Sequence, residues 1–385
     1  MLKCEKALFS LPDSLHYLNC AYMSPLLKSV EEAGITGLKR KSNPAEITIA
    51  HFIDDVDQLR EQVGALVHAS PERVALIPSV SYGVALATHN MTLEKGQRAV
   101  LPGEEFPSNV HGWRDQCRET GAELVVVPRP QDAGEAGALW NEAILEAIDE
   151  RTALVALTHV HWTDGTLFDL ERIGKRAREV GAVLLIDGTQ SIGALPFDFE
   201  AIQPDLLICA GYKWCLGPYS YCFAVLGDRF LEGRSFEGAW LHREGSEDFS
   251  RLIHYRDGFR AGARRFDVGE HANFALAPML NESIRQILAW GVDNIQDYCR
   301  GLVERLSDAL SGTEFALTSL AGQSAHLFGI HIPDESRIPG IMEELRNRQI
   351  HVSVRGSSIR VSPHVYNDMD DMDVLAKALK DVLER

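Results

Sequence analysis

Hydrophobic and polar positions follow two alternating patterns between about residue 52 and residue 218. In one, apolar residues recur every three or four positions, as in 142–150 and 170–180, which predicts amphipathic helices. In the other, short aliphatic runs end at Gly, Pro or Ser, which predicts strands bounded by turns. The predicted strands are residues 73–78, 99–102, 124–128, 153–157, 182–186 and 205–209. Because strands and helices alternate, we expect a largely parallel sheet with helices on both faces.

The pattern changes after residue 218. One more strand is predicted at 220–226, an irregular polar stretch runs to about 262, and helices are predicted at 277–290 and 292–310. A smaller α+β pattern follows, with strands at 326–332, 351–354 and 359–361 and a helix at 338–348. We therefore predict a large α/β domain over residues 16–275 and a small α+β domain over 276–385, on which residues 1–15 pack.

The final helix of the small domain has a strong N-terminal signal. Asn367 or Asp368 can cap it, and Asp370, Asp371 and Asp373 suit the positive end of the helix dipole. This acidic cluster is therefore interpreted as structural.

Charge and composition limit the classes of function. Thirty-eight Lys and Arg against 55 Asp and Glu give a net charge of −17, which argues against nucleic acid and anionic membranes as partners. No apolar run approaches the roughly 20 residues that span a bilayer, and residues 1–10 lack a secretory core, so we expect a cytoplasmic protein. The seven cysteines show no CxxC pairing, which predicts buried free thiols without a structural disulfide.

Several common catalytic motifs are missing from the sequence. There is no GxGxxG after a strand, no GxxxxGK[ST], no HExxH and no GxSxG, which argues against a nicotinamide dehydrogenase in particular. His159 and His161 form an HxH pair, but no third ligand is near them in the sequence, so we expect no metal site.

Two residues near the ends of predicted strands have the chemistry of a cofactor site. Asp187 ends the run Val183-Leu-Leu-Ile-Asp187, where a carboxylate either caps the next helix or pairs with the cationic ring nitrogen of a cofactor such as pyridoxal phosphate (PLP). Lys213 lies among aromatic and apolar residues in Gly211-Tyr-Lys-Trp-Cys-Leu-Gly-Pro218. Such a lysine either extends its amine to the solvent or is buried, and burial lowers its pKa and makes it a usable Schiff-base amine.

Together these segments resemble the class V aminotransferase family of fold-type I PLP enzymes, which also contains kynureninases, cysteine desulfurases, selenocysteine lyases and isopenicillin N epimerase. The resemblance covers nearly the whole chain and extends to residues 18–25, 78–83, 105–113 and 358–367. It implies PLP as the cofactor, a large domain with a mostly parallel seven-stranded sheet and a small C-terminal α+β domain. It also implies a homodimer whose active sites lie at the subunit interface.

The resemblance further implies roles for single residues. Lys213 forms the Schiff base and moves the proton at the substrate's Cα, while Asp187 pairs with the pyridinium nitrogen. The other implied cofactor contacts are Gln190 at the phenolic oxygen, Phe106 on the ring, the Val80 N–H and Ser81 at the phosphate, and His159 nearby. Val80 stands where the family usually has a hydroxyl residue, and Tyr212 could supply that contact instead.

At the substrate end, the resemblance implies that Arg360 binds the carboxylate and that Asn19 lies in the segment closing over the substrate. Simpler interpretations stay open for several of these residues. Residues 79–81 also suit an ordinary helix N-cap, Phe106 suits a hydrophobic core, and Arg360 suits a structural role.

Two departures from the family bear on the reaction. Residues 354–360 run straight through to Arg360 without the catalytic cysteine loop of desulfurases, so a persulfide mechanism lacks its nucleophile. Glu270 follows Gly269 where many members have a Gly-Thr that touches the neighbouring subunit's phosphate, and a carboxylate would repel that group. Trp240 and His242 are faintly similar to a kynureninase segment but do not establish an aromatic substrate.

We therefore expect a PLP-dependent aminotransferase that acts on a small amino acid, since transamination needs no group beyond those named. A kynureninase-like or C–S lyase is an alternative that needs a second acid or base, for which His111, His161 or Tyr22 could serve. An epimerase of the same family is another alternative, and a PLP-binding protein without turnover is a third.

Overall fold

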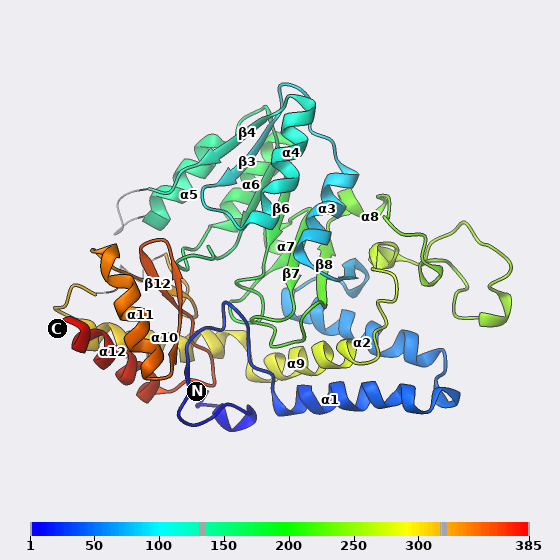
Figure 1. Cartoon of the computed structure of the whole chain (residues 1–385). Coiled ribbons are helices and arrows are strands. Elements are labelled where there is room, and N and C mark those ends of the chain that lie inside the picture. Colours follow the sequence, from blue (N-terminus) through cyan, green and yellow to red (C-terminus); the bar gives the residue numbers. More distant parts are fainter. Residues whose placement is uncertain (1, 131–135, 316, 318–321, 384–385) are drawn as a thin grey trace.

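The computed structural model describes residues 2–130, 136–315, 317 and 322–383. A seven-stranded sheet forms its centre, and Figure 1 shows helices on both sides of it. In spatial order the strands are β2 (Val74–Ile77), β8 (Cys222–Leu226), β7 (Leu206–Ala210), β6 (Val183–Asp187), β5 (Thr152–Thr158), β3 (Arg98–Pro102) and β4 (Glu123–Val127). β8 runs antiparallel to β2 and β7, and the other described pairings of this sheet are parallel, which confirms the mostly parallel sheet.

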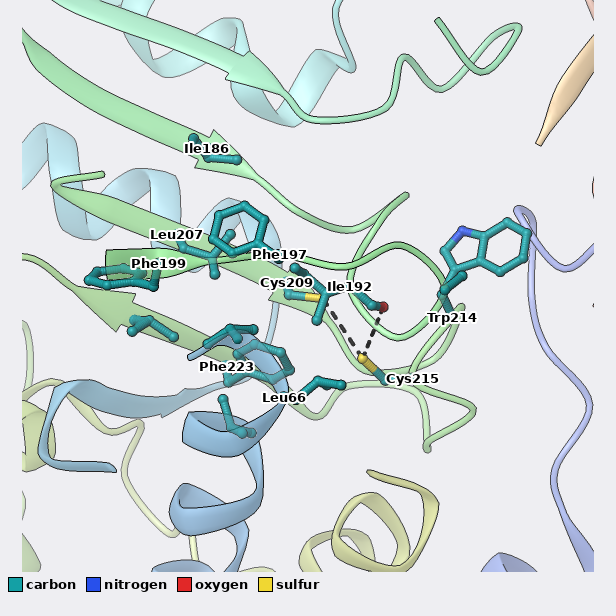
Figure 2. Close-up of a cluster of buried hydrophobic side chains, with 14 of the residues drawn as sticks. Leu66, Ile186, Ile192, Phe197, Phe199, Leu207, Cys209, Trp214, Cys215 and Phe223 are labelled. Carbon is teal, nitrogen blue, oxygen red and sulfur yellow. Dashed lines mark hydrogen bonds between the residues drawn. The ribbon is translucent and has the colours of Figure 1, made fainter. Parts of the chain in front are cut away.

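The central strands form because their aliphatic residues are buried on both faces. Every residue of β6, β7 and β8 is buried. Alternate residues contribute to two separate cores, since Ile186 packs into one cluster and Leu185 into the other. Figure 2 shows the first of these cores, where Ile186, Leu207 and Phe223 from three adjacent strands meet Phe197.

The two cores are closed by different helices. One face of the sheet is covered by α1 (Lys28–Lys39), α2 (Ala50–Val67), α5 (Ala136–Ala147), α6 (Leu170–Val180), α7 (Phe199–Ile202) and α9 (Leu276–Trp290). The other face is covered by α3 (Val80–Asn90), α4 (His111–Thr120) and the short α8 (Asp228–Leu231). No helix among the described residues is long and apolar enough to cross a membrane.

The predicted helices agree with the structure except at one position. The predictions at 170–180 and 292–310 match α6 and α10 (Val292–Leu310), and the one at 277–290 differs from α9 by a single residue. The predicted helix at 142–150 is instead α5, which ends at Ala147. It ends there because the Asp149 N–H donates to the Thr152 hydroxyl (2.9 Å) in a turn that leads into β5.

The C-terminal part is built on three antiparallel strands, β9 (Phe328–His331), β11 (Ser353–Arg355) and β12 (Ser358–Val361), in the order β11-β12-β9. It is packed by α10, α11 (Ile338–Asn347) and α12 (Met369–Leu383). The single strand predicted at 351–354 is wrong, because β10 (Ile350–His351) leaves this sheet and pairs in parallel with β1 (His16–Tyr17).

The start of α12 matches the predicted cap. Asp368 accepts from the Asp371 N–H (3.1 Å), and the Asp371 carboxylate accepts in return from the Asp368 N–H (3.1 Å). Asp371 is buried and also bonds the side chains of Asn367 (2.9 Å) and His16 (2.6 Å). The helix start is thereby joined to β1.

The first residues of the described chain contact the C-terminal part. The Glu5 N–H donates to the Val365 carbonyl (2.7 Å), and the rings of Phe9 and Tyr366 lie 5.1 Å apart. These contacts support the proposed packing of residues 1–15 on the small domain, and the boundary between residues 275 and 276 stays a prediction.

All seven cysteines are free thiols. Six are buried, as expected, but Cys4 is exposed, because it lies in the N-terminal segment rather than in a core. Cys209 and Cys215 place their sulfur atoms 3.9 Å apart in the core drawn in Figure 2.

Candidate active site

A cavity of about 260 Å³ lies at one edge of the central sheet. Strands β2, β5, β6 and β7 end at this edge, as ligand sites in open α/β sheets require. Seven of the residues singled out in the sequence line it together: Val80, Ser81, Phe106, Asp187, Gln190, Tyr212 and Lys213. The remaining three, Asn19, His159 and Arg360, lie outside its walls.

One end of the cavity is the N-terminus of α3. Ser79 caps this helix by accepting from the Tyr82 N–H (3.1 Å), so the N-cap interpretation describes the structure. Val80 and Ser81 begin the first turn, where backbone N–H groups have no partner within a helix. Their position in the cavity wall, at the positive end of the helix dipole, suits an anion such as a phosphate.

Asp187 closes β6 inside the cavity wall and is buried. It does not cap a helix, because the next one, α7, begins at Phe199. One carboxylate oxygen accepts from the Thr189 N–H two residues later (2.9 Å). Burial raises the pKa of Asp187, and only the Thr189 contacts and Lys213 oppose that rise. The carboxylate is thus poised for a cationic partner within the cavity.

Lys213 is buried and does not reach the solvent, with 7 % of its surface exposed. Its Nζ lies 5.6 Å from the centre of the Phe106 ring and 5.8 Å from that of Tyr212. Burial lowers the pKa of Lys213 to about 8, although the charge of Asp187 acts in the opposite direction. A substantial fraction of this amine is therefore neutral near pH 8 and able to act as a nucleophile or base.

The turn after Asp187 packs closely against the backbone of the segment that carries Lys213. Gly193 has φ +98°, and a Cβ at this position would lie 2.4 Å from the Trp214 carbonyl oxygen. The Trp214 indole N–H donates to the Gln190 side-chain oxygen (2.8 Å). The two segments that line the cavity are therefore fixed to one another.

Gln190 uses its amide in two directions. Its oxygen is taken by Trp214, and its nitrogen donates to the Ala21 carbonyl (3.2 Å), which leaves one N–H for the cavity. The sequence interpretation missed His326, whose Nε2 donates to the Gln190 backbone oxygen (2.7 Å). This histidine is buried, its pKa is lowered by burial to about 4, and no local sequence signal marks it.

Phe106 stands in the cavity wall, edge-to-face with Trp162 at a centroid distance of 5.5 Å. Its position depends on Glu105, a residue that the sequence interpretation did not single out. The Glu105 carboxylate accepts from the Phe106 N–H (2.7 Å) and the Thr158 N–H (2.9 Å). It thereby ties the loop after β3 to the end of β5.

Arg360 is buried beside the cavity, on β12. One guanidinium nitrogen donates to the Trp162 carbonyl (2.8 Å), while Nε and Nη2 have no hydrogen-bond partner. Burial lowers the pKa of Arg360 to about 9, and the nearby Arg355 contributes to the same effect. No carboxylate of the described residues lies within 4 Å, so this buried guanidinium has no anionic partner.

The segment of residues 19–24 connects this part of the site to Lys213. Asn19 accepts from the Ser353 hydroxyl (2.8 Å), and the Ala21 N–H donates to the Ser362 hydroxyl (3.0 Å). At the other end, the Ser24 hydroxyl donates to the Tyr212 carbonyl (3.1 Å). The side chain of Asn19 is therefore used within the protein fold.

The two histidines near the site have different surroundings. His159 is half-buried, with its ring edge-to-face with Phe197 and its Nδ1 without a hydrogen-bond partner, and desolvation lowers its pKa to about 3. The nitrogens of His161 contact Arg129 and Thr163 on one side and the Gly103 carbonyl on the other. Neither ring lines the cavity, and no three His, Cys, Asp or Glu side chains in the described part of the chain are grouped to hold a metal ion.

Glu270, Trp240 and His242 lie away from this cavity. Glu270 is exposed, and with Trp240 it lines a separate surface groove beside Phe52 and Phe274. His242 is buried behind this groove.

Comparison with known proteins defines the family. The sequence model described as "Aminotransferase class-V" matches residues 41–375. The chain belongs to the class V aminotransferase family. This is a PLP-dependent family, which agrees with the carboxylate, lysine and helix N-terminus that share the cavity of this class V chain.

The curated relatives of this class V chain have different names. A probable cysteine desulfurase of Methanothermobacter thermautotrophicus is 27 % identical over 351 residues, covering 85 % of this chain and 83 % of the relative. An uncharacterized aminotransferase of Bacillus subtilis is 26 % identical and covers 83 % of this chain and 82 % of its own length.

Solved structures share the fold. The apo cysteine desulfurase of Thermococcus onnurineus aligns with a TM-score of 0.83 at 19 % identity, over 100 % of this chain and 99 % of the other. The cystine C–S lyase C-DES, in complex with cysteine persulfide, aligns with a TM-score of 0.82 at 20 % identity, over 96 % and 98 % of the two chains.

Proposed function

We propose that this protein is a PLP-dependent aminotransferase acting on a small amino acid, with Lys213 as the residue that binds the cofactor covalently. The observation that carries the proposal is the placement of Lys213, Asp187 and the N-terminus of α3 around one cavity. When bound there, PLP supplies an electron sink that weakens the bonds at the substrate's Cα.

The residues of the cavity divide the tasks of holding the cofactor. The N–H groups of Val80 and Ser81 would bind its phosphate, and Asp187 would pair with its ring nitrogen, which gives the buried carboxylate the cation it lacks. Phe106 would cover one face of the ring, and Gln190 would donate its remaining N–H to the phenolic oxygen. Tyr212 lines the same cavity and would contribute its hydroxyl at the phosphate end.

Lys213 and Arg360 would act on the substrate. Arg360 offers two unpaired nitrogens, a geometry that matches a carboxylate at two points. The amine of Lys213 would take the proton from the substrate's Cα and deliver it to a different carbon, and its lowered pKa suits this role. No other basic side chain of the described residues lines the cavity, and transamination requires no other.

A C–S lyase is the second candidate, because the relatives include cysteine desulfurases and the structural neighbours a cystine C–S lyase. Desulfurase chemistry through an enzyme thiol has less support. Cys222 is the one described cysteine in the cavity wall, its sulfur is directed to the Pro78 carbonyl (3.5 Å), and burial raises its pKa to about 12. A lyase here would expel its leaving group without an enzyme persulfide.

The test is to follow the visible absorption of the PLP-loaded protein with a panel of amino acids, while products are identified by mass spectrometry. Transamination predicts that the absorption is lost as keto acid is released and returns only when a second keto acid is supplied. Unaided return with a cleaved product identifies a lyase, and return with an inverted amino acid identifies an epimerase.

A lysine variant provides the control for cofactor attachment. Lys213→Ala should hold no PLP that borohydride can fix to the chain, whereas the surface variant Lys175→Ala should retain it. A Lys213→Ala protein that still carries fixed PLP would overturn the assignment. We also propose, from the sequence resemblance, that the enzyme is a cytoplasmic homodimer.

A further inference from the structure

Two arginines share one face of the β11-β12 hairpin. Arg360 is paired across the hairpin with Ser353, and Arg355 with Ser358. Paired residues of antiparallel strands point to the same face, as do residues two apart on one strand. Arg355 and Arg360 are therefore diagonal neighbours on the face that carries Ser353, whose hydroxyl donates to Asn19 of the segment bridging to the cavity.

Arg355 is unpaired, as Arg360 is. Its Nη1 donates only to the Val354 carbonyl (2.7 Å), and its Nε is buried without a partner. No carboxylate of the described residues lies within 4 Å of it, in a chain whose net charge is −17 and whose other arginines are extensively ion-paired. Two unpaired cations side by side repel each other, and the charge of Arg355 adds to burial, the larger cause, in lowering the pKa of Arg360. An anion with two charges would relieve that repulsion.

Trp162 connects both arginines to the cavity, whose wall includes Trp162 and neither arginine. The Arg355 guanidinium carbon lies 5.2 Å from the centre of the Trp162 ring, and the Trp162 carbonyl accepts from Arg360. The indole itself lines the cavity next to Phe106. Stacking on an aromatic ring orients a guanidinium and leaves its edge free for a planar, two-point contact with a carboxylate.

We propose that Arg355 binds a second carboxylate of the substrate, so that the enzyme acts on α-amino acids with a further carboxylate at their distal end. This inference rests on the proposed function, in which Arg360 holds the α-carboxylate. Two sources share the required chemistry: a dicarboxylic amino acid such as aspartate or glutamate, and cystine, whose second half carries its own carboxylate.

Binding of unreactive ligands tests the proposal without turnover. The PLP-loaded protein would be titrated by calorimetry with glutarate, which has two carboxylates, and with butyrate, which has one. We expect glutarate to bind at least about tenfold more tightly than butyrate, and Arg355→Gln to remove that preference. Arg346→Gln, at an exposed arginine of α11 without an ion pair, should keep it.

The outcomes of this titration are distinct. Equal affinity for the two ligands in the unaltered protein would overturn the proposal, and so would a preference that survives in Arg355→Gln. Arg355→Lys keeps the charge and loses the fork, so a partial preference in this variant would support the two-point contact. The ligand preference of Arg355→Lys can also be measured if Arg355→Gln does not fold.

Turnover separates the sources of the second carboxylate. Arg355→Gln should raise KM about tenfold or more for glutamate, aspartate or cystine, whichever the enzyme uses, and leave KM for alanine within about twofold. Activity confined to monocarboxylic amino acids would refute this inference while leaving the proposed function intact. If no amino acid reacts, the proposed function fails, and the calorimetric preference still decides the role of Arg355.

Discussion

Glu105 is a buried carboxylic acid with no cation of the described residues within 4 Å. Two backbone N–H groups, of Phe106 and Thr158, point at its oxygens. Burial nevertheless raises the pKa of Glu105 to about 8, and the charge of Asp187 adds to the rise. Glu105 therefore keeps its proton at neutral pH and places no second negative charge beside Asp187.

Replacing Glu105 by Gln should change how stability depends on pH. Between the ordinary pKa of 4.5 and the folded value of about 8, folded Glu105 holds a proton that the unfolded chain releases. Its contribution to stability is thus present below pH 4.5 and is lost as pH rises through this window, by up to about 1.4 kcal/mol per pH unit. The free energy of unfolding in urea, measured from pH 5 to 8, should fall less steeply in Glu105→Gln than in the unaltered protein.

The variant also loses one hydrogen bond, because an amide nitrogen cannot accept from a backbone N–H. At pH 5 it should therefore be less stable than the unaltered protein, by about 1–3 kcal/mol or more. Glu119→Gln, on the exposed side of α4, is the matched control and should follow the pH profile of the unaltered protein. Parallel profiles for Glu105→Gln and the unaltered protein would show that Glu105 does not titrate in this window.

Residues of the site differed in how far the sequence could reveal them. Asp187 and Lys213 belong to short segments with a strong local pattern, so their presence in one cavity could be predicted. Glu105 and His326 act through backbone groups of distant strands, and such contacts leave no periodic or compositional trace. His159 was predicted near the cofactor and lies outside the cavity wall.

At the scale of the elements, the start of α12 holds two distant segments together. The buried Asp371 bonds His16 of β1, the Asn367 side chain and the Asp368 N–H. Because each donor would be left unsatisfied without this carboxylate, its loss costs more than a single surface interaction.

Asp371→Ala should therefore lower the free energy of unfolding by about 2–4 kcal/mol. Asp370→Ala removes an exposed carboxylate from the same helix turn and should cost about 0.3–1 kcal/mol, the usual effect on a helix dipole. Urea unfolding followed by circular dichroism compares the two. Equal losses would mean that the contacts of Asp371 add nothing to its dipole effect.

The elements themselves were largely predictable, because the sheet strands are short aliphatic runs, and those of β2, β6, β7 and β8 are buried throughout. The exception is β10, whose partner β1 lies more than 330 residues away. Two-residue strands have no periodicity to detect, and their pairing is decided by the packing of the whole chain. The sequence pattern at 351–354 therefore merged β10 with β11.

At the scale of the whole molecule, residues 243–259 form an arm that projects from the body, as Figure 1 shows. Its base is closed by the bridge between Arg243 and Phe259. Ile253 is 77 % exposed and Tyr255 is 96 % exposed, which is costly for side chains of this size in water. Such an arm fits the homodimer expected from the sequence.

Sedimentation velocity should show a particle of about twice 42.7 kDa. The double variant Ile253→Ser, Tyr255→Ser should form a weaker dimer, because it removes apolar surface from the expected interface. Its dimer should therefore dissociate at protein concentrations at which the unaltered enzyme is still dimeric. Val126→Ser replaces an exposed apolar residue on β4, away from the arm, and should leave the monomer–dimer equilibrium unchanged. A monomer at all concentrations would contradict the expected dimer.

The segment of residues 19–24 has a consequence for how the enzyme becomes active during synthesis. It reaches Lys213 through Tyr212 and Gln190, but it is held on its other side by Ser353 and Ser362. A ribosome therefore releases the sheet, with Lys213 and Asp187, well before the chain that supports this segment. Contacts between residues so far apart in sequence form late in folding. Nascent chains should consequently acquire a complete substrate pocket only after their last hundred residues have emerged. We expect the protein to retain its cofactor best from that point of synthesis.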